Sequence, residues 1–125
     1  MLKRVLIADD AAFMREMLRD ILTEGGFEIA AEAIDGNEAI ELYQEHTPDL
    51  VMLDIVMPRK SGLEALKEIM GLSPGACIVM CSALGQETLV MDALEAGARD
   101  FIVKPFKPDK VLEVVGKAME KSREG

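Results

Sequence analysis

The sequence predicts an α/β fold in which a doubly wound, five-stranded parallel sheet is flanked by five helices. Short, continuous apolar segments recur along the chain, as expected for strands that helices cover on both faces. Helix-like stretches separate these segments, and glycine or proline marks most of the boundaries. Strands that alternate with helices in this way indicate a parallel sheet between two helical layers.

The strands are predicted from their apolar composition. Four continuous apolar runs occupy residues 5–8, 50–53, 77–81 and 101–103. The segment 27–33 alternates less regularly and carries Glu28 and Glu32, which is typical of a strand at the edge of a sheet.

The helices are predicted in the stretches that follow each strand, at residues 12–23, 37–45, 63–72, 86–96 and 109–121. Gly25, Pro48, Pro74 and Gly97 stand just beyond four of them. Glycine favours a helix end because it adopts the left-handed conformation, and proline cannot continue a helix.

Length and charge limit the possible functions. The chain has 125 residues, 50% of them hydrophobic, with a net charge of −9 and a pI of about 4.6. This length suits one domain, and we expect residues 1–125 to form it. An acidic chain disfavours binding to nucleic acid or to an anionic membrane, and it favours a basic or neutral protein partner.

The cysteine spacing and the length of the apolar segments indicate the cellular compartment of the protein. On one strand Cys77 and Cys81 would lie ~13 Å apart, beyond the limit of about 7 Å for a disulfide. No apolar segment approaches the ~20 residues that a membrane span needs. We therefore expect a cytoplasmic monomer with reduced thiols.

Polar residues follow four of the predicted strands at the point where each ends. They are Asp9 and Asp10, Asp54, Ser82 and Lys104. Ligands of open α/β sheets bind beyond the carboxyl ends of the strands, so these side chains are expected to share one crevice. Each residue alone could be a helix cap, a turn residue or a solvated charge. Their joint occurrence favours a functional site.

This set of residues predicts phosphoryl transfer assisted by a metal ion. Clustered carboxylates repel one another, which implies a cation, and a small set of oxygen ligands suits Mg²⁺. Asp9, Asp10 and Asp54 are the expected ligands, and Asp54 is the expected nucleophile. Ser82 could donate a hydrogen bond to one phosphoryl oxygen, and Lys104 could pair with another. Water can cleave the resulting acyl phosphate, which suits a reversible signal.

These residues closely resemble the receiver domain of two-component response regulators, over essentially the whole chain. The resemblance is carried by the acidic pair Asp9-Asp10, by segment 54–58, by Ser82-Ala83 and by segment 97–106. Within the family, segments 9–15 and 81–86 look most like the stand-alone chemotaxis regulators. The resemblance implies a flavodoxin-like strand order of 2-1-3-4-5. It also implies the backbone carbonyl of Val56 as a metal ligand and a cis bond between Lys104 and Pro105.

The resemblance also implies partners and a function. A chemotaxis-type histidine kinase would phosphorylate Asp54 in a Mg²⁺-dependent reaction, a flagellar motor switch protein would be the target, and a phosphatase would reset the signal. Such a receiver has no output domain and catalyses only its own phosphorylation and dephosphorylation, so it is not a conventional enzyme.

Two positions depart from the family pattern. Ser61 precedes Gly62 where the family usually has Asp or Asn, and Phe101 stands where chemotaxis regulators often carry tyrosine.

Three alternatives remain open at this point. A single-domain phosphorelay or sporulation regulator would share the same motifs. A phosphatase of the haloacid-dehalogenase type would also use a nucleophilic aspartate, but it requires an acid two residues later, where this chain has Val56. A flavodoxin-like cofactor binder would need a phosphate loop after the first strand, where Asp9 and Asp10 would repel phosphate.

Ser82 and Phe101 are the predicted switch residues. If Ser82 moves to bond the phosphoryl group, Phe101 could turn into the space beside helix 86–96. We then expect partner binding on the face formed by helix 86–96, strand 101–103 and helix 109–121. Helix 109–121 carries an apolar stripe that is wider than one core-facing side requires, which supports this expectation. The alternative is that this helix is buried over a broad arc. The stripe consists of Val111, Leu112, Val114, Val115, Ala118 and Met119.

Two apolar residues predict slow self-dephosphorylation. In receivers, the side chains two residues beyond the phosphoacceptor and two beyond the hydroxyl residue flank the attacking water. Here they are Val56 and Leu84, which cannot orient water by hydrogen bonding.

Overall fold

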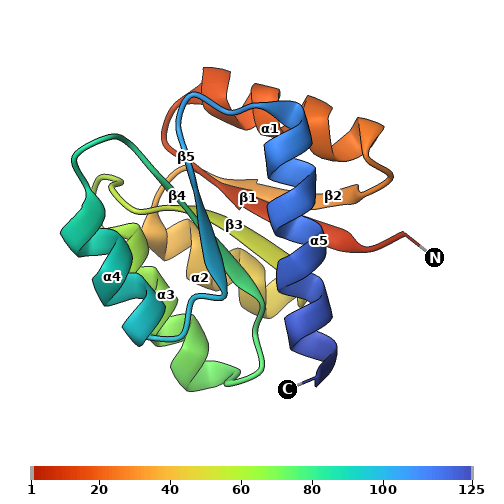
Figure 1. The fold of residues 1–125 in the computed structure, drawn as a ribbon. Helices are drawn as coiled ribbons and strands as arrows, with labels where there is room; N and C mark the ends of the chain where they lie inside the picture. The colour runs from red at the N-terminus through yellow and green to blue at the C-terminus, as the bar shows by residue number, and fades with distance from the viewer. Residues whose placement is uncertain (1, 125) are drawn as a thin grey trace.

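The computed structural model describes residues 2–124, in which strands and helices alternate along the chain (Figure 1). The strands are β1 (Arg4–Ala8), β2 (Glu28–Ala33), β3 (Leu50–Asp54), β4 (Ile78–Ser82) and β5 (Asp100–Val103). The helices are α1 (Ala12–Glu24), α2 (Gly36–His46), α3 (Gly62–Leu72), α4 (Glu87–Glu95) and α5 (Pro108–Glu124). Every predicted element is present, and the boundaries differ from the predicted ones by a few residues at most.

The sheet has the order β2-β1-β3-β4-β5, and each neighbouring pair is parallel. This confirms the predicted flavodoxin-like order of 2-1-3-4-5. The strand order reverses at β1, which pairs with β2 on one side and β3 on the other. The register pairs Ala8 with Leu53, so the residues that follow, Asp9 and Asp54, emerge next to each other at the carboxyl edge of the sheet.

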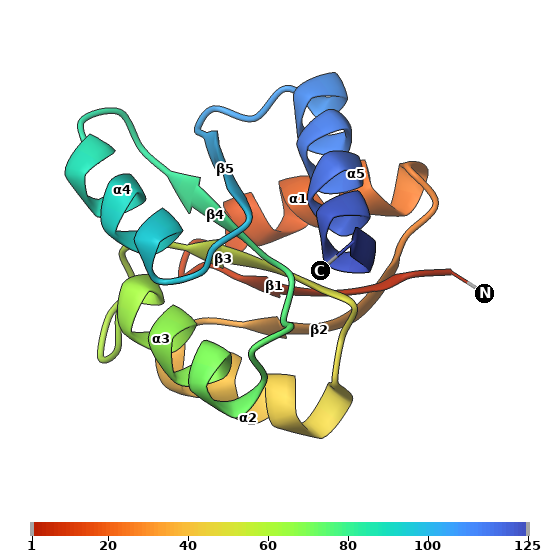
Figure 2. The same ribbon diagram turned by 60° about the horizontal axis from the view of Figure 1, so that its bottom comes forward.

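The helices form two layers. α1 and α5 cover one face of the sheet, and α2, α3 and α4 cover the other (Figures 1 and 2). The central strands are buried on both faces, so their side chains divide between two cores. Leu6 and Leu53 belong to the core beneath α2, α3 and α4, whereas Ile7 and Met52 belong to the core beneath α1 and α5. These packed layers fix the strand ends where the polar residues lie.

The apolar stripe of α5 is part of the core, and the prediction that it widens a binding surface is wrong. Four of its residues are buried, and Leu112 and Met119 are partly buried and pack against the same core. α5 packs against β5, β4 and α1, so one helix needs apolar side chains over a broad arc. Its outer side carries Glu113, which forms ion pairs with Lys110 at 3.6 Å and with Lys117 at 3.7 Å.

None of the helices within residues 2–124 combines the length and the apolar character needed to cross a membrane. Cys81 lies in β4 and Cys77 immediately precedes that strand. Both thiol side chains are buried.

Candidate functional site

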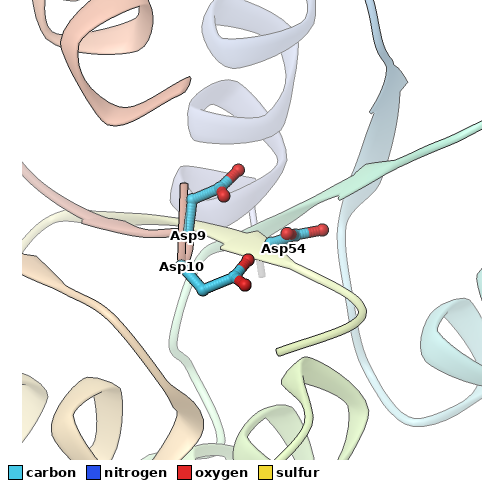
Figure 3. Close-up of side chains that lie close together, drawn as sticks. All are labelled: Asp9, Asp10 and Asp54. Atoms are coloured by element: carbon cyan, nitrogen blue, oxygen red, sulfur yellow. The ribbon is translucent and has the colours of Figure 1, made fainter. Parts of the chain in front are cut away.

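Three carboxylates meet at the carboxyl edge of the sheet. Asp9 follows β1 directly, Asp10 is the next residue, and Asp54 is the last residue of β3. One oxygen atom from each of the three lies within 4.8 Å of the other two (Figure 3). Asp9 and Asp54 are buried, whereas Asp10 is exposed. The structure therefore brings together the three carboxylates that the sequence predicted to act together.

Asp9 has one oxygen atom available for a cation. Its Oδ1 accepts a hydrogen bond from the backbone N–H of Ala11 at 2.9 Å. Its Oδ2 is buried and accepts no hydrogen bond from any residue in the described part of the chain. The Nζ atom of Lys104 lies 3.0 Å from this oxygen and forms an ion pair with it. Lys104 therefore balances part of the charge of this oxygen, and no residue within 2–124 donates a hydrogen bond to it, so the atom can still bind a metal ion.

Lys104 joins the cluster from β5. It follows the last residue of that strand, and its backbone N–H donates to the carbonyl of Ser82 at 2.8 Å. Its Nζ donates a hydrogen bond of 3.2 Å to Oδ2 of Asp54. The peptide bond between Lys104 and Pro105 is cis, as the family resemblance implied. The ammonium group therefore lies where it can pair with a charged group on Asp54.

The environment of Asp54 opposes its ionisation. Burial and the neighbouring charge of Asp9 raise the pKa of Asp54 to about 6, although Lys104 acts in the opposite direction. The same two carboxylates raise the pKa of Lys104 despite its partial burial. One ammonium group balances only part of the charge of three carboxylates. A divalent cation would stabilise the ionised cluster, and the all-oxygen donor set fits Mg²⁺.

Ser82 is the buried last residue of β4. The register pairs Asp54 with Cys81, so Ser82 lies one residue beyond the position opposite Asp54. Its hydroxyl donates a long hydrogen bond of 3.4 Å to the carbonyl of Ile102. Ser82 and Phe101 line the same apolar cavity of about 200 Å³ beside α4. The two predicted switch residues are therefore connected through one space.

The predicted metal ligand Val56 and the residue Leu84 lie on the loops after β3 and β4. Their side chains are 52% and 83% exposed, respectively. Neither side chain carries a hydrogen-bonding group, so neither can hold a water molecule against Asp54. The role of the Val56 carbonyl as a ligand stays a prediction.

Two residues that support the site were missed by sequence reasoning. The Nη1 atom of Arg15 on α1 donates to the carbonyl of Asp9 at 2.7 Å, which fixes the backbone between the two N-terminal carboxylates. Gly62 packs so closely against Asp54 that a Cβ atom would overlap the Asp54 carbonyl oxygen. The Ser61-Gly62 pair at a helix start was the available signal for the second residue. No local pattern marked Arg15.

Comparison with known proteins identifies the family. The sequence model of the response regulator receiver domain family matches residues 5–116 of this chain. The chain belongs to this family. The match covers the five strands except for Arg4, the first residue of β1, and it includes Asp9, Asp10, Asp54, Ser82 and Lys104.

Individual relatives agree with this receiver assignment. The chain is 56% identical to the chemotaxis protein CheY of Thermotoga maritima, over 92% of this chain and 96% of the relative. It is also 56% identical to the chemotaxis protein CheY of Bacillus subtilis, over 95% of this chain and 99% of the relative. Among solved structures, a chain of the CheX–CheY–BeF3–Mg²⁺ complex from Borrelia burgdorferi superposes with a TM-score of 0.89 and 44% identity. That match covers 92% of this chain and 87% of the other.

The family assignment settles two of the alternatives. A receiver domain is neither a haloacid-dehalogenase-type phosphatase nor a flavodoxin-like cofactor binder, although it shares the strand order of the latter. The chain is therefore not a conventional enzyme.

Proposed function

We propose that this chain is a chemotaxis response regulator that is phosphorylated on Asp54 and then changes its affinity for a partner protein. The observation that carries the proposal is the cluster in which Asp9, Asp10 and Asp54 meet, with Lys104 bonded to Asp54. A buried carboxylate with a raised pKa, beside a second buried carboxylate and a lysine that forms ion pairs with both, suits phosphoryl transfer.

Four groups of this chain would hold Mg²⁺: the carboxylates of Asp9, Asp10 and Asp54 and the backbone carbonyl of Val56. When bound, the ion would neutralise charge on the carboxylates and on the phosphoryl oxygens. Asp9 suits this role because its Oδ2 atom is buried and accepts no hydrogen bond from the described residues. Asp10 is exposed, so it stays ionised in the metal-free protein without the cost of a buried charge.

Asp54 is the proposed nucleophile. One carboxylate oxygen forms a bond to phosphorus while the bond from phosphorus to the donor's histidine nitrogen breaks, and the electron pair of that bond leaves with the nitrogen. The lysine that now bonds Oδ2 of Asp54 would then pair with a phosphoryl oxygen. Charge-assisted bonds of this kind are stronger than the neutral bond that Ser82 now makes.

Ser82 would transmit the change. Its hydroxyl bond to the carbonyl of Ile102 is long, at 3.4 Å, so a phosphoryl oxygen can compete for this donor. If Ser82 turns toward the phosphoryl group, it leaves the cavity that it shares with Phe101. Phe101 is 36% exposed, and its inward movement would alter the surface between α4 and β5. Met91 on α4 and Val103 on β5 line the same cavity and are partly exposed there.

The proposed partners follow from the relatives. A histidine kinase would be the donor, a flagellar motor switch protein the target and a phosphatase the off-switch, all in the cytoplasm. The names of the similar chemotaxis proteins, and the crystallised complex of a related CheY with CheX, support this set. A phosphorelay regulator would differ by returning the phosphoryl group to a histidine protein. We propose that residues 1–125 act as one receiver domain.

A binding experiment tests the proposal. Isothermal titration calorimetry should show one Mg²⁺ ion bound to the wild type and greatly weakened binding to Asp10→Asn. With Mg²⁺ and the phosphoryl mimic BeF3⁻, affinity for the motor switch protein of the same organism should rise. Partner affinity that is the same with and without the mimic would contradict the proposed switch, and the absence of Mg²⁺ binding would contradict the proposed site.

A further inference from the structure

The loop after Asp54 is tied to a different element by an ion pair that the proposed reaction does not use. The Nε atom of Arg59 lies 2.6 Å from Oδ2 of Asp35, which precedes α2. Asp35 is only 4% exposed, whereas the Arg59 side chain is 57% exposed. The buried Asp35 carboxylate therefore receives a charged partner from the surface.

Asp35 is itself held rigidly. Its Oδ1 caps α2 by accepting from the backbone N–H of Glu38 at 2.8 Å. This bond, followed by the bond from Arg59, lowers the pKa of Asp35, so the carboxylate stays charged. Asp35 therefore offers a fixed negative charge at the start of a packed helix.

The Arg59 backbone adopts a conformation that needs support. Its φ angle is +65°, and the N–H of Lys60 donates to the carbonyl of Pro58 at 2.7 Å, which closes a tight turn around Arg59. A non-glycine side chain at positive φ in such a turn is strained. Strain of this kind persists only where surrounding contacts impose it. The bond to Asp35 is the side-chain contact available to impose it here.

A backbone bond links the same two loops. The N–H of Gly36 donates to the carbonyl of Lys60 at 2.9 Å. A Cβ atom at position 36 would overlap that carbonyl, so the close approach requires glycine. The loop then returns to the strand through the N–H of Gly62, which donates to the carbonyl of Ile55 at 2.8 Å. The segment that contains Val56 is thus fixed at both ends, by β3 and by the start of α2.

We propose that Arg59 is a positioning residue that, through Asp35, holds the loop after Asp54 in its metal-binding conformation. The inference rests on the proposed function, because Val56 on this loop is the fourth proposed ligand. It adds that the affinity for Mg²⁺ depends on the contact between Arg59 and Asp35 at the start of α2. Partners that orient metal ligands in this way typically contribute roughly ten-fold or more to affinity.

Arg59→Ala gives the most informative test. The substitution keeps a side chain at positive φ and removes the ion pair. Loss of a surface positive charge alone would leave binding of a divalent cation unchanged or slightly tighter, whereas loss of positioning would weaken it. We expect calorimetry to show roughly ten-fold weaker Mg²⁺ binding. Asp35→Asn, which retains a capping side chain, should weaken binding similarly, and the double variant should add little because the pair acts as one unit.

Amide hydrogen exchange in metal-free protein supplies a readout that does not depend on the reaction. The Gly36 N–H should exchange roughly ten-fold faster in Arg59→Ala and Asp35→Asn than in the wild type. Lys60→Gln is the matched control. It removes one positive charge and the Lys60–Glu68 pair at 2.7 Å from the same loop. It should leave the Gly36 exchange rate near that of the wild type, and Mg²⁺ binding unchanged or slightly tighter.

The outcomes separate this inference from the proposed function. Wild-type protein that binds no Mg²⁺ would overturn the proposed function. A wild type that binds Mg²⁺, with Arg59→Ala binding it equally or more tightly, would overturn the positioning role alone. An unchanged exchange rate for the Gly36 N–H in both variants would show that the ion pair does not hold the loop, and would overturn it as well.

Discussion

The ammonium nitrogen of Lys104 lies 3.2 Å from Oδ2 of Asp54, although the two residues are 50 positions apart in the sequence. This bond occupies a carboxylate that the proposed mechanism phosphorylates. The lysine must therefore exchange the carboxylate for the phosphoryl group when Asp54 reacts. In the unmodified protein it partly offsets the repulsion between Asp54 and Asp9, and this role has consequences for stability.

Asp54→Asn is expected to stabilise the metal-free protein. Burial first, and then the Asp9 charge, raise the pKa of Asp54 to about 6 from an ordinary value of 3.8, so the folded state favours the protonated carboxyl group. Stability from this group is present below pH ~4 and is lost as the pH rises through ~6. At pH 7 the neutral amide should raise the free energy of unfolding by on the order of 1–3 kcal/mol.

Urea denaturation at several pH values, with chelator present, measures this effect. The wild type should lose stability between pH ~4 and ~6, and Asp54→Asn should show a flatter profile in this window. Added Mg²⁺ should restore wild-type stability by binding the folded state. Asp10→Asn is the control, because Asp10 is exposed and its substitution should change stability less. Parallel profiles for the wild type and Asp54→Asn would refute the explanation.

Val56→Asn is expected to shorten the lifetime of the phosphorylated protein. Val56 is half exposed beside the site and offers no hydrogen bond, whereas an amide can orient a water molecule toward phosphorus. The half-life should fall several-fold, and Val56→Ala, which adds no polar group, should leave it nearly unchanged. A time course of intact-protein mass spectrometry gives both half-lives. Equal half-lives for the two variants would exclude water orientation as the limiting factor.

Ser82→Ala and Lys104→Ala are expected to separate labelling from signalling. Asp54 keeps its carboxylate in both variants, so labelling should continue at a lower rate. Phosphorylation-dependent binding to the partner should weaken in both, because each removes one donor that distinguishes the two states. Phe101→Ala should also weaken it, through the cavity shared with Ser82, but without slowing labelling. Variants that retain the wild-type ratio of affinities would show that the signal leaves Asp54 by another route.

Much of the fold and of the site was predictable because buried parallel strands leave a clear record in composition. The apolar runs that became β1, β3 and β4 defined strand ends, and the sheet rule then placed Asp9, Asp54 and Ser82 at one edge. The register between Ala8 and Leu53 completes this arrangement through backbone pairing. The residue types at the strand ends were then sufficient to predict the chemistry of the site.

The supporting contacts were not predictable, because each is a single side-chain contact that leaves no repeating pattern in the sequence. Arg15 reaches the carbonyl of Asp9 across a helical turn, and Arg59 reaches Asp35 from 24 positions away. The prediction that the apolar stripe of α5 contributes to a binding surface was wrong for a related reason. Its apolar arc is broad because it packs on two strands and on α1, and the sequence pattern cannot distinguish several buried contacts from one exposed surface.

The most direct test of the account is intact-protein mass spectrometry after incubation with acetyl phosphate. Wild-type protein should gain one phosphoryl group in the presence of Mg²⁺ and none when the metal is chelated, while Asp54→Asn should gain none under either condition. Asp10→Asn should be labelled slowly, because one proposed ligand is lost. Undiminished labelling of Asp54→Asn, or wild-type labelling that is equally fast without Mg²⁺, would contradict the assignment of Asp54 as the metal-dependent phosphoacceptor.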